Sequence, residues 1–531
     1  MLYNLFFINK AFHIDDTFTI NIAQAVNKNF INVPYVFFSN PILLGYYYAP
    51  VIRLFGESEI WMHLFYLPFS LLVIASMYFL SLRFTGKGLL PTLSLVVTPA
   101  FIIMSHNIML DIPLLGLFLT SLAVFIYGID KNNKKLLFLS GVLAGLTVLV
   151  KYTGLILIPL MLFYCLLSDK RKYCLFLMIP IFLFSIWCVH NIIFYRSLPF
   201  IQALLMRLHP LSAGTILKRV FTCLSFISGT SIILFLLTPF ILVNRKEFFL
   251  LFSSFPIGLC PFLIKSIFGE YTFIEKVFLS LLFVLSLFLI FSMLKLYLSS
   301  RSKKSYNKDR QFLFLWFFII LFFNISSQFV TARFILLLFP PMLLLFYEKI
   351  ITSRIYSKNI FRKLIIPFHV IVFLFSTVLA IGDFRFAGIY RDFVEYLQKN
   401  YSDKMLYFGR LSYSDYYAWG YSYYLNRYFP YGESKNSLIH SQDIFLASPT
   451  EAVLPIVIQG KSFTNDFNLN RFLVGEVDYK SHVFLHNRKQ RTGFYSYDWG
   501  LLPFKITFGK STLEKFNIYK LPLNTNIRLP R

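Results

Sequence analysis

The chain has 531 residues, of which 57% are hydrophobic and only 14% are charged, and its mean hydropathy is +0.64. Soluble globular proteins carry about 25% charged residues, so this composition excludes an ordinary soluble fold and indicates a polytopic α-helical membrane protein. The net charge of +26 fits basic loops that orient membrane helices better than it fits binding to nucleic acid, so no nucleic-acid partner is expected.

The first sixty residues are expected to form an extracytoplasmic loop (domain 1–60) with an acidic pair and an amphipathic helix. Residues 1–12 are partly apolar but would rise only about 18 Å as a helix, against roughly 30 Å of hydrocarbon. Asp15 and Asp16 follow, ahead of a helical pattern that runs from Phe18 to Phe30. We therefore expect a start that lacks a first helix, so that the complete protein would have thirteen spans.

Twelve apolar segments are expected to cross the bilayer as helices, which together form a membrane domain over 61–383. They are 61–82, 89–108, 112–128, 136–150, 153–167, 174–194, 224–243, 248–268, 274–297, 311–330, 333–347 and 364–382. Lys and Arg alternate with this count: 21 of them lie in the loops and span ends on one side and 8 on the other. Because positive residues favour the cytoplasmic side, the acidic loop and everything after about residue 383 should lie outside the cytoplasm.

The last part of the chain, 384–531, is expected to be a small extracytoplasmic mixed α/β domain. Ile389, Phe393, Tyr396 and Leu397 share one face of an amphipathic helix. Short strand-like runs follow this helix in the sequence. These runs are Met405–Gly409, Asp443–Ser448, His482–His486 and Phe516–Leu521.

Polar residues at membrane depth are costly, and four places on the predicted outer face carry them. They are the pair Asp15-Asp16, His106 with Asp111, Lys151, and Arg333. Each has an ordinary explanation, because an Asp can cap a helix, a His can sit at the interface and a Lys can extend to the lipid headgroups. Taken together, carboxylates and cations from segments far apart in sequence, all on one face, suggest a single site.

No other motif competes with this interpretation. The chain has no Walker loop, dinucleotide fingerprint, zinc motif or serine-nucleophile elbow. Its five cysteines stand in or beside apolar segments at no metal-ligand spacing, so neither a zinc site nor a disulfide framework is predicted.

The order of these residues resembles the GT-C superfamily of membrane glycosyltransferases, in its branch of protein mannosyltransferases and lipid A aminoarabinose transferases. That branch has an acidic pair in its first outer loop, similar to Asp15-Asp16, and a second outer acidic residue, similar to Asp111. A Gly-Leu-x-x-Leu-x-Lys run matches Gly145 to Lys151, and a late Arg before a Pro-rich helix start matches Arg333. The chain departs from the family's first-loop Lys-Pro-Pro, where it has Ser39-Asn40-Pro41, and it has His106 where the family often has Arg.

The resemblance implies a glycosyltransferase that uses a sugar on a polyprenyl phosphate and a lipid, glycan or protein acceptor. Asp15 would be the base, and Asp16 and Asp111 would shape the site or hold a divalent metal, although no cofactor is certain. Lys151 and Arg333, together with His106, would stabilise the departing carrier phosphate.

Two other functions fit the same sequence. A transporter or flippase for an amphipathic lipid-linked substrate would also have about twelve spans, but the chain shows no internal repeat and its polar residues lie at one face instead of the midplane. A noncatalytic scaffold for envelope assembly is the second alternative, and replacement of Asp15 would separate it from an enzyme.

Overall fold

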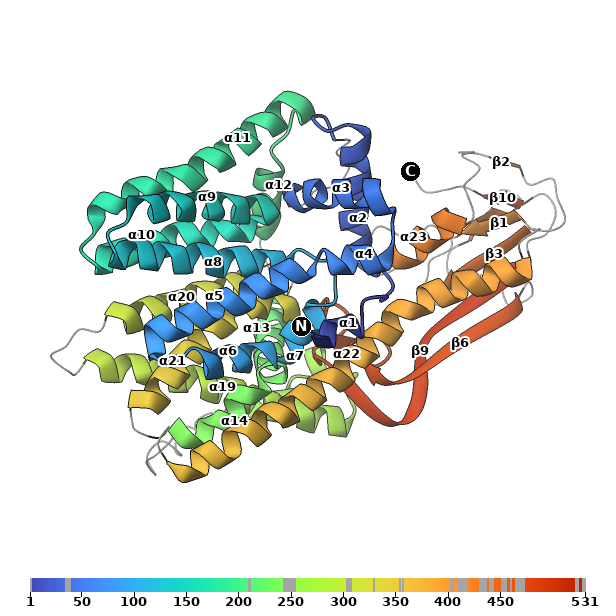
Figure 1. Ribbon diagram of the computed structural model, residues 1–531. Helices are drawn as coiled ribbons and strands as arrows, with labels where there is room; N and C mark the ends of the chain where they lie inside the picture. The colour runs from blue at the N-terminus through green and yellow to red at the C-terminus, as the bar shows by residue number, and fades with distance from the viewer. Residues whose placement is uncertain are drawn as a thin grey trace.

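The computed structural model describes most of the membrane part and selected segments of the C-terminal part. The described residues are 2–33, 40–208, 212–241, 255–301, 308–327, 330–352, 355, 358–401, 405–408, 419–428, 437–438, 444–449, 456–458, 461–463, 473–520 and 525–527. Figure 1 shows a bundle of helices joined to a C-terminal sheet by the long helix α22 (Asn359–Tyr401), with the N-terminus at the centre of the molecule.

The helices before residue 242 form the first part of the bundle, and several are short. They are α1 (Leu2–Leu5), α2 (Asp16–Lys28), α3 (Leu43–Phe55), α4 (Glu59–Leu64), α5 (Leu67–Thr85), α6 (Leu89–Val96), α7 (Pro99–Met104), α8 (Asp111–Asp130), α9 (Lys134–Val150), η1 (Tyr152–Ile156), α10 (Leu157–Leu167), η2 (Arg171–Leu177), α11 (Met178–Tyr195), α12 (Pro199–Leu208), α13 (Ala213–Thr230) and α14 (Ile232–Ile241). The other helices that the structure describes before α22 are α16 (Phe255–Gly258), α17 (Cys260–Leu263), α18 (Lys265–Phe268), α19 (Phe273–Arg301), α20 (Lys308–Ser326), η3 (Ala332–Leu338) and α21 (Phe339–Thr352).

The chain is a polytopic α-helical membrane protein. Among the described residues, 7 helical segments are long and apolar enough to cross a bilayer, and α13 with α14 would add one more if this pair, bent by 75°, is a single span. The seven are Glu59–Thr85, Asp111–Asp130, Arg171–Tyr195, Phe273–Tyr297, Lys308–Ser326, Ala332–Thr352 and Asn359–Tyr401. The total of twelve stays a prediction.

The segment 89–108, predicted as one span, is not a continuous helix. It breaks into α6 and α7, and the Thr98 hydroxyl accepts a hydrogen bond from the backbone N–H of Phe101 as the N-terminal cap of α7. Pro99 explains the break, because proline lacks an N–H and disfavours helical geometry in the residue before it. The predicted span 248–268 lies partly outside the described residues, and its described part is divided among α16, α17 and α18.

Helix α8 lies at the centre of the bundle and α11 lies at its rim. The apolar window of α8 is 72% buried within the protein, against 17% for the window that contains α11. Helix α8 packs between α5 and α9, and α11 packs on the outer side of α9 (Figure 1). Asp111, the first residue of α8, is likewise buried inside the protein, although it lies at the end of a membrane helix.

The C-terminal part contains a 4-stranded sheet in the order β1-β3-β9-β6. Its strands are β1 (Met405–Phe408), β3 (Ile444–Pro449), β6 (Leu473–Phe484) and β9 (Lys505–Lys520), and β1 is parallel to β3 while the other pairs are antiparallel. A second 4-stranded sheet, built from short strands, has the order β2-β10-β4-β5. Its strands are β2 (Ser437–Leu438), β4 (Ile456–Ile458), β5 (Lys461–Phe463) and β10 (Thr525–Ile527). A 2-stranded sheet pairs β7 (His486–Asn487) with β8 (Thr492–Gly493). The first two predicted strands coincide with β1 and β3.

Helix α22 continues from the membrane part into the C-terminal part without a break. Its 43 residues include both the predicted last span and the predicted amphipathic helix, so the proposed domain boundary at 383/384 lies inside one helix. Ile389, Phe393 and Leu397 are buried as the pattern predicts, whereas Tyr396 is 38% exposed. This half of α22 packs against β6 and against α23 (Trp419–Tyr428).

Candidate functional site

Four of the predicted site residues meet in one ionic cluster. Arg333 Nη1 lies 2.6 Å from Asp15 Oδ2 and 3.6 Å from Asp111 Oδ2. Lys151 Nζ donates to Asp111 Oδ1 at 2.8 Å. Both carboxylates therefore contact the same guanidinium nitrogen, and the four side chains alternate in charge.

The backbone places each of these residues at the end of an element. Asp111 is the first residue of α8, and Lys151 follows α9 in an extended conformation before η1. The chain reverses tightly after Lys151. Gly154 consequently lies so close to the end of α9 that an added Cβ would be 2.7 Å from the backbone of Thr147. Arg333 follows the cap residue Thr331 at the start of η3.

Asp15 stands behind an unusual backbone conformation. Ile14 has a φ of 46°, in the left-handed region that β-branched residues rarely adopt. Such conformations persist only where the surroundings hold them, and they are concentrated at functional sites. The turn at Ile14 precedes α2 and brings Asp15 to Arg333.

A small cavity, open on one side, adjoins the cluster. Asp111, Lys151 and Arg333 form its polar wall together with Thr153 and Asn324, and apolar side chains form the rest: Leu114, Ile320, Phe323, Phe334, Leu336 and Leu337. Lys151 Nζ also lies 4.1 Å from the centre of the Phe334 ring, which favours a cation there.

The cluster is more exposed at one end than at the other. The Asp15 side chain is 31% exposed, whereas that of Asp111 is 5% exposed. Burial lowers the pKa of the Lys151 ammonium, while the Asp111 carboxylate opposes this change. Asp15 is thus the carboxylate that a substrate can reach most readily.

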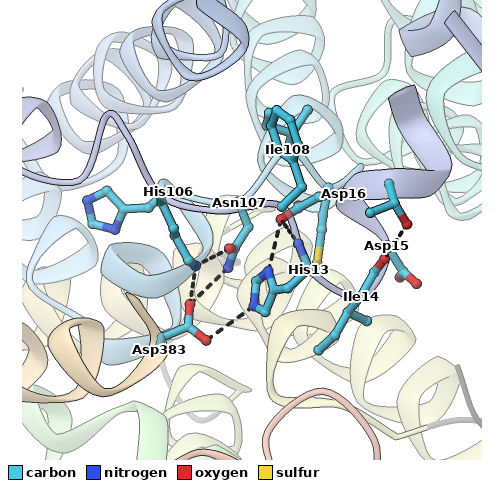
Figure 2. Close-up of polar contacts among 12 residues, drawn as sticks. His13, Ile14, Asp15, Asp16, His106, Asn107, Ile108 and Asp383 are labelled. Atoms are coloured by element: carbon cyan, nitrogen blue, oxygen red, sulfur yellow. Dashed lines mark hydrogen bonds and ion pairs between the residues drawn. The ribbon is translucent and has the colours of Figure 1, made fainter. Parts of the chain in front are cut away.

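Asp16 does not join this cluster, although it follows Asp15 in the chain. Its Oδ2 lies 2.9 Å from His13 Nδ1 and accepts from the His13 backbone N–H at 3.1 Å. Figure 2 shows the Asp15 carboxylate turned away from this pair. Asp16, predicted to shape the site or hold a metal next to Asp15, is instead buried in a second network.

That second network links the acidic loop to α22 and to the C-terminal part. Lys10 donates to Asp383 and to Asn107. Tyr495 OH donates to Asp383 Oδ1 at 2.7 Å, and His13 Nε2 lies 3.4 Å from the same oxygen (Figure 2 shows His13 and Asp383). Lys10 and Asp383 are not among the residues predicted for the site. In the sequence, Asp383 differs from its surroundings only as a lone acidic residue beside the apolar run of α22.

His106 also lies away from the four-residue cluster. It is 3% exposed, its Nε2 lies 3.1 Å from Asn4 Oδ1, and its ring centre is 4.4 Å from that of Phe7. Figure 2 shows its ring on the far side of Asn107 from His13. The prediction that His106 binds the carrier phosphate has no support from this position, because aromatic packing against α1 and the turn after it occupies its ring.

The segment 485–504, between β6 and β9, returns to the membrane part beside Arg333. The backbone N–H of Ala332 donates to Phe494 O at 2.9 Å, and the N–H of Tyr497 donates to Val330 O at 3.2 Å. Arg491 and Lys505 each lie 2.7 Å from a carboxylate oxygen of Glu275 in α19. This segment, which the sequence analysis did not single out, therefore helps to fix the start of η3.

A further buried cation is Arg219 in α13. It is 3% exposed, and within the part of the chain that the structure describes its Nε and Nη1 have no hydrogen-bond partner. Helix α13 packs against η3, and the neighbouring Lys218 lies 5.1 Å from the ring centre of Tyr497. A buried guanidinium with unsatisfied donors is a strong candidate to bind an anion.

The described residues contain no group of three or more His, Cys, Asp or Glu side chains arranged to hold a metal ion. The divalent metal that the resemblance implies therefore stays a prediction. Asp15 and Asp111 have cations as their partners in this structure.

Residues 39–194 match the family model described as dolichyl-phosphate-mannose-protein mannosyltransferase. Over these residues the match bears out the predicted resemblance to the protein mannosyltransferases. The match covers His106, Asp111 and Lys151, whereas Asp15, Arg219 and Arg333 lie outside it. No curated protein matches the chain.

Two solved structures of ArnT from Cupriavidus metallidurans are similar over most of their length. The apo structure is 14% identical, covers 79% of this chain and 82% of that chain, and has a TM-score of 0.40. The structure of ArnT bound to undecaprenyl phosphate is 12% identical, covers 87% of this chain and 94% of that chain, and has a TM-score of 0.43.

Proposed function

We propose that this chain transfers a sugar from a polyprenyl-phosphate-linked donor to an envelope lipid, glycan or protein at the outer face of the cytoplasmic membrane. The observation that carries this proposal is the contact of Asp15 and Asp111 with one nitrogen of Arg333, beside a cavity with largely apolar walls. The family match supports a donor on a polyprenyl phosphate, because dolichyl phosphate belongs to that class.

The chemistry follows from the exposure of the two carboxylates. An acceptor hydroxyl gives its proton to Asp15, the more exposed carboxylate, and its oxygen attacks the anomeric carbon of the sugar. A new bond forms between that carbon and the acceptor oxygen, while the bond to the carrier phosphate breaks and its electron pair stays on the phosphate. Asp111, held by Lys151, keeps Arg333 in place for this step.

The departing phosphate needs a positive partner that the carboxylates have not neutralised. Lys151 and Arg333 are paired with Asp111 and Asp15, so these four residues carry no net charge together. Arg219 is our candidate for this cation, because its helix α13 packs against η3 and its buried Nε and Nη1 lack partners among the described residues. We assign the carrier phosphate to Arg219, with Arg333 and Lys151 on the side that faces the sugar.

The test of the proposal is the variant Asp15→Asn in membrane vesicles supplied with labelled decaprenyl-phosphate sugars. We expect at least a hundredfold loss of label transfer to envelope acceptors, whereas decaprenyl phosphate should still raise the thermal stability of the purified variant. Asp169→Asn, at an exposed loop position, is the control and should transfer normally. Transfer at the wild-type rate by Asp15→Asn would reject the enzyme and favour a scaffold or a lipid transporter.

The phosphate assignment has its own variant. Arg219→Gln should weaken the binding of decaprenyl phosphate about 10- to 100-fold, because a charged hydrogen-bond partner is lost. Arg53→Gln, at an exposed position in α3, should bind as the wild type does. Equal affinity in Arg219→Gln and the wild type would place the phosphate elsewhere.

A further inference from the structure

A bulge near the start of β9 leaves two apolar side chains uncovered. Several residues of β9 stand opposite one residue of β6, His482, and we call the segment 506–510 the β9 bulge. Ile506 is half exposed and Phe508 is fully exposed. A Cβ added to Gly509 would meet no atom within 4 Å, so the surface of the bulge is open. Single exposed apolar residues are ordinary at a protein surface, so the role of this pair depends on where the bulge lies.

The contacts of the bulge place it beside the membrane part of α22. Val483, the strand partner of Ile506, packs so closely on α22 that a Cβ at Gly382 would lie 2.5 Å from Val483 Cγ1. The ring centre of Phe504, just before the bulge, lies 5.2 Å from that of Phe375, within the apolar run of α22. Figure 1 shows β6 and β9 bending back beside α22. The bulge therefore begins at the level of Gly382.

The exposed face of α22 changes character at this level. From Val370 to Ile381 every exposed residue of the helix is apolar, and the next exposed residue is Arg385. In a membrane helix, a change from exposed apolar to basic residues marks the boundary between the hydrocarbon and the lipid headgroups. The turn that contains Gly382 therefore lies at this boundary, and the β9 bulge lies beside it.

Helix α19 brings the end of a second membrane helix to the same place. Lys505 Nζ, next to the bulge, lies 2.7 Å from Oε1 of Glu275 in the first turn of α19. Beside Glu275, Phe273 and Ile274 are 73% and 79% exposed at the start of this apolar helix. The β9 bulge thus adjoins the ends of two membrane helices, and its uncovered apolar surface continues theirs.

The strand pair exposes charged residues farther from the membrane part. Strand β6 exposes Glu476, Asp478 and Lys480 in alternation, which is a face suited to water. Lys510 is exposed at the end of the bulge, and a lysine at this level would be attracted by the phosphates of lipid headgroups. Apolar residues beside the membrane helices, with a cation next to them, fit a lipid surface better than they fit a second copy of this chain.

We propose that the β9 bulge inserts into the nearer leaflet of the bilayer and holds the C-terminal sheet against the membrane. Ile506 and Phe508 lie among the acyl chains, and Lys510 contacts the headgroup phosphates. The sheet is then attached to the membrane part in three ways: by the continuous helix α22, by the pair of Lys505 with Glu275, and by lipid under the bulge. This attachment does not depend on sugar transfer.

Tryptophan reporters test the proposal in the full-length chain, reconstituted in lipid nanodiscs of phosphatidylcholine with or without brominated acyl chains. The emission of the 5 native tryptophans is subtracted with the wild-type protein. Phe508→Trp and Ile506→Trp should each add emission that brominated chains reduce at least twofold. Ile381→Trp, on the lipid-facing side of α22, gives the quenching that full contact with acyl chains produces.

The matched control is Val474→Trp, because Val474 is also an apolar residue that is about half exposed, at the other end of the same strand pair. Its added emission should be quenched by iodide in the water and unchanged by bromination. The same behaviour at positions 506 and 508 would overturn the proposal, since the bulge would then face water. Protection of both reporters from iodide and from brominated chains would also overturn it, because a second copy of the chain would then cover the bulge.

Discussion

Arg333 Nη1 lies 2.6 Å from Asp15 Oδ2, although nearly the whole membrane part separates these residues in the sequence. The contact joins the loop before α2 to the start of η3, and Asp111 joins the same nitrogen from α8. Three segments thus converge on one cation. The strained turn at Ile14 directs Asp15 towards this cation, whereas Asp16 is directed into the interior.

This divergence predicts different defects for the two adjacent carboxylates. Asp15→Asn should lose transfer activity with little change in thermal stability, because the residue is partly exposed and belongs to the reacting site. Asp16→Asn should lower the unfolding midpoint, because it replaces the buried charged partner of His13. Transfer assays and thermal unfolding in the same detergent measure both effects. The reverse pattern would exchange the roles given to the two residues.

The buried pair of Lys10 and Asp383 predicts a strong coupling in a double-mutant cycle. Lys10→Met or Asp383→Asn alone leaves a buried group without its partner, and each should cost about 3–5 kcal/mol of unfolding free energy. The double variant should cost clearly less than the two costs added.

The control for this cycle is the pair of Lys480 and Asp478, whose side chains are 55% and 32% exposed. Lys480→Met should change the unfolding free energy by less than about 1 kcal/mol. Additive costs for Lys10 and Asp383 would mean that the two charges do not interact in the folded protein.

His13 should make stability depend on pH. Burial and Lys10 lower the pKa of its imidazole, but Asp383 and Asp16 outweigh them, so the pKa is raised. A raised pKa in the folded state gives a stabilisation that is complete below the unfolded pKa of about 6.5 and is lost as pH rises through the folded value. The unfolding midpoint should therefore fall as pH increases from 6 upward, and His13→Gln should flatten this slope. An equal slope in both proteins would exclude His13 as its source.

The returning segment 485–504 predicts a strict requirement for glycine at position 500. A Cβ at Gly500 would lie 1.8 Å from the backbone oxygen of Arg491. Gly500→Ala should therefore disturb the segment that bonds to Ala332, and should lower both the unfolding midpoint and transfer activity. Gly509→Ala, where no atom lies within 4 Å of the added Cβ, should change neither. Normal activity in Gly500→Ala would show that this segment does not hold Arg333 in place.

Topology is a separate prediction that rests on the charge asymmetry of the loops. Reporter fusions at Ser305, which lies outside the described residues, and at Asn526 should report opposite sides of the membrane, with Ser305 cytoplasmic. The same side at both positions would invert the placement of the site at the outer face.

The sequence predicts much of the membrane part, because apolar runs and loop charges are local signals. It also indicates Asp15, Asp111, Lys151 and Arg333 through their common side and the family resemblance. The direction of Asp16 could not be predicted, because it depends on one positive φ at Ile14.

Other parts of the site depend on contacts that a local pattern does not contain. Asp383 is paired with Lys10 from the other end of the chain, and the state of Arg219 depends on the packing of α13. Pro99 is a local signal for a helix break, since proline interrupts helical hydrogen bonding. The uniformly high hydropathy of 89–108 nevertheless favours a single span in a prediction from the sequence.

The continuity of α22 has a mechanical consequence. As a helix of 43 residues it is roughly 65 Å long, about twice the hydrocarbon thickness, and Asp383 lies past its midpoint. Asp383 in this helix is paired with Lys10, so the same helix connects the sheet with the chain segment that leads to Asp15. A chain truncated after α22 would lose Tyr495 from Asp383 and Phe494 from Ala332 at once. The sheet and the helical bundle are therefore structurally coupled, and removal of the sheet would disturb contacts inside the bundle.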